Sequence, residues 1–258
     1  MSDIYLFRTA LRDLIRPGKL FAFAILVALP FLVCTIVKWK TSPEEYAATT
    51  YYGIWIAMYV YGFVLTMTSV IFSSGIIAQE VEQKTIVYLL TRPLPRWRIL
   101  LMKYLASILI TTVVCWLTTL AIALATVGPT HLGAAPLAHD ILFMPIGVSV
   151  YSALFLLMGT LLNRPLILGL IFAFGWEYLI VVLPGYGQYC AIVTYLRVLS
   201  PHEMPAWMNK WALLSASIVE PPTRMLSWIV VLTLLIVTLG ASFVIFSTRE
   251  YVPREEAG

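Results

Sequence analysis

The sequence has few charged residues and little of the chemistry that most enzymes use. Only 12% of its 258 residues are Asp, Glu, Lys or Arg, and it has three cysteines and three histidines. No CxxC pair and no even-numbered set of cysteines occurs, so neither a zinc site nor structural disulfides are predicted. No H-E-x-x-H or G-x-S-x-G motif occurs, which argues against a metalloprotease or a serine hydrolase.

A phosphate-binding loop is also missing. No G-x-x-x-x-G-K-[ST] pattern occurs, so we predict that the chain is not itself an ATP-hydrolysing enzyme and that such energy comes from another polypeptide. No cofactor is predicted. His202, Met204 and Met208 lie close together in sequence and are soft ligands that could hold copper(I). Such a grouping in a loop is more often coincidence, so no metal site is predicted.

Long apolar stretches dominate the chain. The mean hydropathy is +0.89 and 60% of the residues are hydrophobic, values too high for an ordinary soluble domain. A helix needs roughly 20 residues to cross a hydrocarbon core about 30 Å thick, and these runs lack the alternation of barrel strands. The sequence therefore predicts an all-α polytopic membrane protein, with residues 1–258 forming a single transmembrane domain. The six predicted spans are Leu20–Val37, Ile54–Ala78, Ile99–Val127, Ile141–Leu162, Leu166–Leu183 and Met225–Phe246.

The distribution of basic residues predicts which side of the membrane each loop faces. With the N-terminus inside, the cytoplasmic segments hold twelve Lys and Arg residues and the outer segments hold five. Because cytoplasmic loops carry the excess of Lys and Arg, both termini are predicted to be cytoplasmic. These flanking residues explain the net charge of +4, which therefore does not indicate nucleic-acid binding.

Two regions outside the spans carry amphipathic patterns. Residues 1–18 place Arg8, Arg12 and Arg16 on one helical stripe beside an apolar stripe, which predicts an interfacial helix with its arginines at lipid headgroups. A solvated basic leader is the alternative. Residues 184–224 contain two apolar stretches too short to span, which we expect to be outer interfacial or re-entrant helices before the last span. They either cap an outward exit or simply pack there.

The segment 79–98, QEVEQKTIVYLLTRPLPRWR, concentrates charge between the second and third spans. It holds six charged side chains, with acids first and bases later, an order that suits a short helix across the cytoplasmic face. The prolines near its end would terminate that helix, because proline removes a backbone donor. Residue chemistry leaves two interpretations open. The helix either docks a soluble partner or anchors the protein, with Arg92, Arg96 and Arg98 holding lipid phosphates.

This segment resembles the signature of ABC-2 type permeases, the membrane subunits of ATP-driven transporters. Their pattern is roughly E-x-E-x-G-T-x-x-x-L-L-[ST]-x-P-[VIL]-x-R followed by a Gly-Lys pair, and here Lys84 and Met102 replace the two glycines. A second stretch, GWEYLIVVLPG at residues 175–185, resembles the W-E-x-x-x-x-x-x-P-G of the fifth span in many such permeases. The residues on the first pattern are Glu80, Glu82, Thr85, Leu89, Leu90, Thr91, Pro93, Leu94, Arg96 and Lys103.

The resemblance implies that this segment is a coupling helix, which in such permeases sits in a cleft of the ATPase subunit. It also implies two permease chains, identical or different, and two ATPase subunits in a bacterial plasma membrane, with export as the expected direction. The alternative is a non-transporting membrane scaffold or regulatory subunit of an ABC-like complex. A transporting permease should have a cavity lined by polar side chains, whereas a scaffold need not. The residues expected to line such a pathway are Glu177, Ser149, Ser152 and Thr160. The residues expected to contact the ATPase or clamp the coupling helix are Glu80, Glu82, Lys84, Thr85, Arg92, Pro93 and Arg96.

Glu177 is a lone acid within an apolar span. Counted from Arg164 at 1.5 Å per residue, it lies roughly 20 Å into the helix, in the outer half of the membrane. Because a charge at that depth costs a few kcal/mol, such a residue usually faces a cavity or a partner. Glu177 is therefore expected either to line a translocation path or to make a structural hydrogen bond to a neighbouring helix or to the loop above.

Overall fold

The computed structural model describes residues 3–14, 17–41, 46–77, 95–129, 132–134, 136–177, 179–180, 186–202 and 222–248. All regular structure within these ranges is helical. Five helices are long and apolar enough to cross a membrane, which confirms an all-α polytopic membrane protein. Their bounds are Phe21–Lys40, Ala48–Ile77, Arg96–Thr126, Leu137–Leu161 and Arg224–Thr248.

One of these five helices changes its winding along its length. It begins as α3 (Ala48–Ile54), continues as the π-helical segment η1 (Trp55–Val64) and returns to α-helix in α4 (Leu65–Ser73). A π-helix usually appears as a single wide turn, often at a functional site, so ten residues of it mark this span as unusual. The other four spans belong to α2 (Pro17–Lys40), α7 (Arg96–Thr126), α8 (Leu137–Leu161) and α13 (Arg224–Thr248).

The fifth predicted span, Leu166–Leu183, is described only in part. The structure has α9 (Pro165–Ile171) followed by a second π-helical segment, η3 (Phe172–Glu177). Together they form an apolar helix that is shorter than a membrane span, and residues 178 and 181–185 lie outside the described ranges. The six-span topology therefore stays a prediction.

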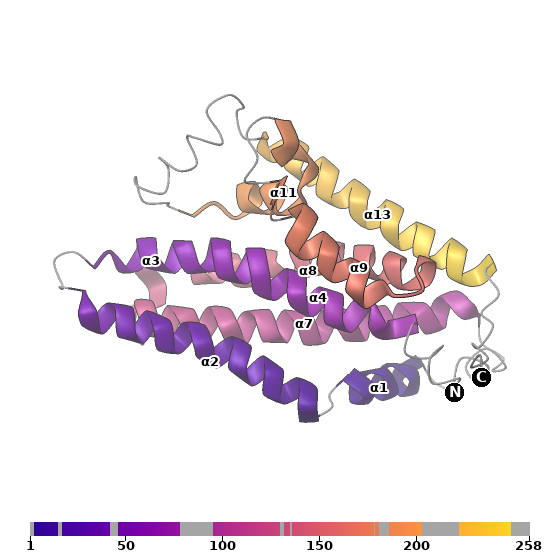
Figure 1. Cartoon of the computed structure of the whole chain (residues 1–258), viewed down its shortest axis with the longest axis horizontal. Helices are drawn as coiled ribbons and strands as arrows, with labels where there is room; N and C mark the ends of the chain where they lie inside the picture. The colour runs from indigo at the N-terminus through magenta and orange to yellow at the C-terminus, as the bar shows by residue number, and fades with distance from the viewer. Residues whose placement is uncertain are drawn as a thin grey trace.

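The long helices run side by side along the length of the molecule (Figure 1). α2, α7, α8 and the α3–η1–α4 helix lie roughly parallel or antiparallel, while α13 and α9 lie along one side of them (Figure 1). The N-terminal helix α1 (Asp3–Leu14), the end of α4, the start of α7 and the end of α13 gather at one end of this bundle (Figure 1). We call this the proximal end, and the opposite end, where α2 ends and α8 begins, the distal end.

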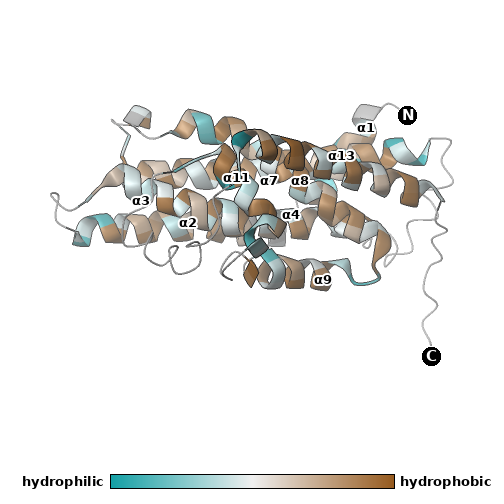
Figure 2. Ribbon diagram, turned by 90° about the horizontal axis from the view of Figure 1, so that it is seen from above, coloured by the Kyte–Doolittle hydropathy of each residue, from teal (hydrophilic) through white to brown (hydrophobic). Residues whose placement is uncertain are grey.

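The three central helices form the core of the bundle. About half of the residues in the most apolar part of each central helix are buried, 56% for Ala48–Ile77 and 50% for both α7 and α8. The corresponding shares are only 17% for α2 and 22% for α13. α2 and α13 therefore present large apolar side chains outward, among them Phe21, Leu32 and Ile236. Figure 2 shows hydrophobic residues, coloured brown, along much of the length of the helices. A surface of this kind needs lipid or another apolar helix to cover it.

Polar side chains tie neighbouring helices together through backbone carbonyls. Lys38 Nζ at the distal end of α2 donates to the carbonyl oxygen of Thr126 at 3.0 Å, where a cation suits the last turn of α7. The hydroxyl groups of Tyr59 and Tyr104 donate to the carbonyl oxygens of Leu26 and Ser149, each at 2.9 Å. Within a bilayer such bonds take the place of water, since nothing else there can satisfy a polar group.

The two amphipathic regions outside the spans are described in part. α1 confirms a helix within residues 1–18. In the outer stretch 184–224 the structure has η4 (Tyr186–Cys190) and α11 (Ile192–Leu199), while residues 203–221 lie outside the described ranges. Five of the eight residues of α11 are buried, and this helix packs against α13 and η1. α11 therefore packs onto the bundle, while its interfacial or re-entrant character stays a prediction.

A glycine sets the separation of α4 and α8. A Cβ atom built on Gly159 would lie 2.8 Å from the carbonyl oxygen of Ser74, a distance that real Cβ atoms do not show. Ser74 directly follows α4, so this contact holds the proximal end of that helix against α8. Small residues allow membrane helices this kind of close backbone approach.

We predict that Gly159→Ala destabilises the protein, because α4 or α8 must shift to make room for one methyl group. Overpacking of this kind typically costs about 1–3 kcal/mol. The measurement is thermal unfolding of the purified full chain in mild detergent, and the variant should unfold at a lower temperature.

Gly240→Ala is the matched control. Gly240 lies inside α13, and no neighbouring atom would come within 4 Å of a Cβ atom added to it, so alanine there should be neutral or slightly stabilising. Equal melting temperatures for the two variants would show that the α4–α8 contact is not tight.

Candidate functional site

Most residues predicted to couple to an ATPase lie outside the described ranges. These are Glu80, Glu82, Lys84, Thr85, Arg92 and Pro93. The described residues on either side, Ile77 and Pro95, connect to α4 and α7 at the proximal end (Figure 1). Any movement of the segment between them would therefore act directly on two core helices.

Arg96 is the one predicted coupling residue that the structure describes. It begins α7, and its Nη1 atom donates to the carbonyl oxygen of Ser247 at 3.3 Å. Ser247 lies in the last turn of α13, where a basic side chain can satisfy a free carbonyl group. Arg96 thus connects the proximal ends of α7 and α13.

The basic residues of α1 lie on its open side. Arg8 and Arg12 are exposed, while Leu6, Ala10 and Leu14 are buried. α1 therefore has one exposed basic face and one buried face, and Arg16 lies outside the described ranges. α1 packs mainly against α7, and contact of its arginines with lipid headgroups stays a prediction.

The carboxylate of Glu177 holds one end of α11. Its Oε1 atom accepts the backbone N–H of Ile192 at 3.0 Å, and its Oε2 atom accepts that of Val193 at 3.4 Å. These are the first two residues of α11, whose amides have no partner within the helix. An anion is also favoured at the positive end of a helix dipole. The contacts match the structural hydrogen bond foreseen for Glu177, which is 5% exposed.

Arg197 and Tyr151 complete a buried polar cluster around Glu177. Arg197 is one of the charged groups that act electrostatically on Glu177. Its Nη2 atom makes a long contact of 3.5 Å with the carbonyl oxygen of Ala57 in η1. The Tyr151 hydroxyl group faces Glu177 but completes no hydrogen bond with good geometry among the described residues. Tyr151 lies about 21 Å along α8 from its start, so the cluster lies deep within the bundle.

Both π-helical segments meet this cluster. Glu177 ends η3, and the carbonyl group that Arg197 contacts belongs to η1. Wide turns of this type often occur where a helix carries a functional group. The cluster of Tyr151, Glu177 and Arg197 is therefore the strongest candidate site within the described spans.

A second polar cluster holds the other end of α11. Asp140 in the first turn of α8 is fully buried and accepts hydrogen bonds from the Tyr52 hydroxyl group at 2.6 Å and the Ser200 hydroxyl group at 2.7 Å. His202 Nε2 lies 3.0 Å from Asp140 Oδ1 and 3.1 Å from Oδ2. Because Ser200 follows α11 directly, Asp140 fixes the C-terminal end of that helix as Glu177 fixes its start.

The hydrogen bonds of His202 define how protons are shared in this cluster. Its Nδ1 atom lies 2.9 Å from the carbonyl oxygen of Ser200, which can only accept, so Nδ1 carries a proton. The contact between Nε2 and Asp140 then needs a second proton, either on the ring or on the carboxyl group. Both arrangements leave the buried pair without net charge, which burial strongly favours.

His139 and His202 are less exposed than the sequence suggests, and His131 lies outside the described ranges. Their positions between apolar runs predict outer loops, but His139 lies in the first turn of α8 and the side chain of His202 is 2% exposed. The neighbouring helices bring polar partners that the local sequence does not reveal. No group of three His, Cys, Asp or Glu side chains among the described residues could hold a metal ion, and Met204 and Met208 lie outside them.

Comparison with known proteins supplies the deciding observation. The family model described as ABC-2 family transporter protein matches residues 15–181, well over half of the chain. The chain belongs to the ABC-2 transporter family. The match includes the charged segment 79–98 and Glu177, which carried the resemblance. A search of the curated proteins gave no match.

Membership of this family gives the chain its general role. It is a multi-pass membrane permease, the transmembrane and non-catalytic component of an ABC transporter. Permeases of this family generally work with an ABC ATPase. The buried clusters described above are therefore parts of a permease bundle.

The permease contains two important groups that sequence reasoning missed. Asp140 immediately precedes a predicted span and resembles an ordinary flanking residue, although it is a lone acid beside an apolar run. Arg197 falls among the predicted outer segments, but its Nε atom is buried. A lone charge within or next to an apolar stretch is the signal that could have identified both.

We predict that Glu177→Ala loosens α11 in the permease. Without the carboxylate the amides of Ile192 and Val193 lose their acceptor, so hydrogen exchange across residues 192–199 should become faster. Loss of one helix cap typically costs about 1 kcal/mol, which corresponds to roughly fivefold faster exchange.

Glu177→Gln is the matched variant, because its amide oxygen can still accept one of the two bonds. It should give exchange rates between those of the wild type and Glu177→Ala. If all three proteins exchange alike over residues 192–199, Glu177 does not hold α11.

Proposed function

We propose that this permease is an exporter that couples to a separate ATPase through residues about 80–98. The family match over residues 15–181, which includes this segment, carries the proposal. The chain also lacks an ATP-binding motif of its own, so a partner must supply hydrolysis. Glu80, Glu82, Lys84, Thr85, Arg92, Pro93 and Arg96 are proposed to contact the ATPase or to fix the coupling segment.

The packing at the proximal end supports a mechanical role for this segment. It follows α4, whose end contacts α8 at Gly159, and it precedes α7, whose first residue bonds α13. A displacement of the segment would therefore be transmitted to α4, α8, α7 and α13 through closely packed contacts. ATP binding to the partner would then shift the population of two permease conformations by differential binding.

The pathway is proposed to lie between two permease chains. Ser152, Thr160 and Glu177 are buried within the single chain. The mostly exposed apolar faces of α2 and α13 offer surface for a second copy, identical or different. Two ATPase subunits would complete the complex.

The orientation follows from the basic residues. The proximal end, with α1 and the coupling segment, is proposed to face the cytoplasm of a bacterial plasma membrane, because twelve of the seventeen Lys and Arg residues fall on that side. Both termini would then be cytoplasmic. The buried cluster of Tyr151, Glu177 and Arg197 is proposed to act at the boundary between the two conformations.

We predict that the tagged permease, purified in mild detergent from its native host, retains an ABC ATPase in equal numbers. The double variant Glu82→Ala, Arg96→Ala should lose the ATPase or its stimulated activity, because both residues fall in the proposed contact. The measurement is the stoichiometry of the purified complex together with its ATPase rate.

Arg98→Ala is the matched control. Arg98 is an exposed arginine of the same segment whose guanidinium lies over the Trp97 ring, and it falls on no position of the family pattern. An ATPase that binds wild type and double variant equally would exclude this docking site. If no ATPase accompanies the wild-type chain, the basic residues are better explained as a lipid anchor. If an ATPase binds but no solute is transported, the alternative of a non-transporting scaffold or regulatory subunit is favoured.

A further inference from the structure

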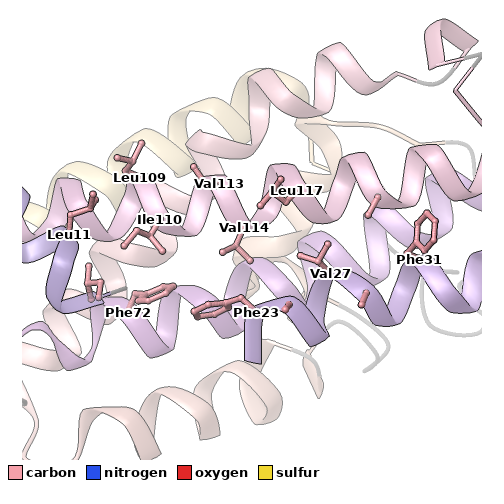
Figure 3. A pocket seen from close by; sticks show the side chains of 14 residues that line it. Leu11, Phe23, Val27, Phe31, Phe72, Leu109, Ile110, Val113, Val114 and Leu117 are labelled. Carbon is pink, nitrogen blue, oxygen red and sulfur yellow. The ribbon is translucent and has the colours of Figure 1, made fainter. Parts of the chain in front are cut away.

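An apolar groove runs along the outside of the bundle between α2 and α7 (Figure 3). Its volume is about 710 Å³, within the range of ligand pockets. Leu11 of α1 lies at one end, Phe31 of α2 lies toward the other, and Phe72 of α4 contributes to its floor (Figure 3). The groove is separate from the buried clusters around Glu177 and Asp140.

Small side chains on facing helices create the hollow. Ala24 and Ala28 of α2 and Ala121 of α7 line it, where larger residues would let the helices fill the space. Phe23 and Phe72 stack beneath it with ring centroids 4.8 Å apart, which gives it a rigid floor. Every lining residue is apolar, so the groove can hold only hydrocarbon.

The length of the groove corresponds to one leaflet. Leu109 and Ala121 both line it and are twelve residues apart on α7, which is about 18 Å. Half of a hydrocarbon core about 30 Å thick is about 15 Å. The groove therefore extends from the α1 end to about the middle of the hydrocarbon core, where an acyl chain of that leaflet ends.

Positive charge lies at the α1 end of the groove. Arg8 and Arg12 are exposed, and Arg8 is three residues from Leu11, so the two share one face of α1. Asp13 is the acid next to them on the described helix. The two exposed arginines therefore lie at the end of the groove where a lipid phosphate would lie above an acyl chain.

We propose that this groove holds one acyl chain of an anionic phospholipid from the leaflet at the proximal end, with its phosphate at Arg8 and Arg12. The lipid would join α1 to α2 and α7 as a resident part of the permease. The proposal goes beyond ATPase coupling and export, because it concerns a bound lipid and holds whichever solute is moved.

The test is native mass spectrometry of the full chain, delipidated in detergent and then offered phosphatidylglycerol or phosphatidylcholine with identical oleoyl chains. The wild type should retain one phosphatidylglycerol per chain, with about tenfold higher affinity than phosphatidylcholine. Replacing both arginines, Arg8→Gln with Arg12→Gln, should remove this preference. Arg8→Lys with Arg12→Lys should keep most of it, because lysine keeps the charge.

Ala28→Trp tests the groove itself, because the indole ring would occupy the space of the acyl chain. It should lower retention of phosphatidylglycerol about tenfold. Ala22→Trp is the matched control on the same helix, since Ala22 is exposed and does not line the groove. Melting temperatures of both variants would show that each is folded.

Three outcomes would overturn the proposal. Equal retention of the two lipids by the wild type would exclude recognition of the phosphate charge by the arginines. Unchanged retention in folded Ala28→Trp would place the lipid elsewhere. A change from dimer to monomer in Ala28→Trp with lipid retention unaffected would assign the groove to a second copy of the chain.

Discussion

The bundle depends on satisfying charged groups that lie out of reach of water. Glu177 is buried, and it is stable there because both oxygens of its carboxylate accept the free amides of α11. A buried carboxylate without donors and buried helix amides without acceptors would each cost free energy. The hydrogen bonds between them remove both costs. They also explain how an eight-residue helix can lie inside the bundle.

The same logic governs the other end of α11 and the proximal end of the permease. Asp140 accepts hydrogen bonds from Ser200 and Tyr52, and its carboxyl group lies 3.0 Å from Nε2 of His202. At the proximal end Arg96 satisfies a carbonyl group of α13, and Gly159 lets α4 meet α8 closely. α11 is thus fixed within the bundle, while the helices leading to the charged segment are connected to one another.

The spans could be predicted from the sequence because hydropathy is a local property. Five of them appear within a few residues of their expected bounds, and the pattern around Glu80 and Arg96 led to the family. The partners of Glu177 could not be predicted, because they are backbone amides of a distant segment. Asp140 and Arg197 were missed for a related reason, since only tertiary packing buries Asp140 and the Nε atom of Arg197. The groove between α2 and α7 likewise arises from alanines that look unremarkable in sequence.

The burial of α11 is the central claim, and cysteine accessibility in sealed membranes tests it most directly. The native Cys34 and Cys115 are replaced, and single cysteines are introduced by Ile192→Cys, Val193→Cys, Leu196→Cys and Leu199→Cys in chains that also lack Cys190. These four should resist a membrane-impermeant maleimide, because all are buried, whereas a single cysteine introduced by Trp39→Cys, an exposed position at the distal end of α2, should react. Labelling of the four positions as fast as that of Trp39→Cys would contradict the account, because α11 would then lie on the surface.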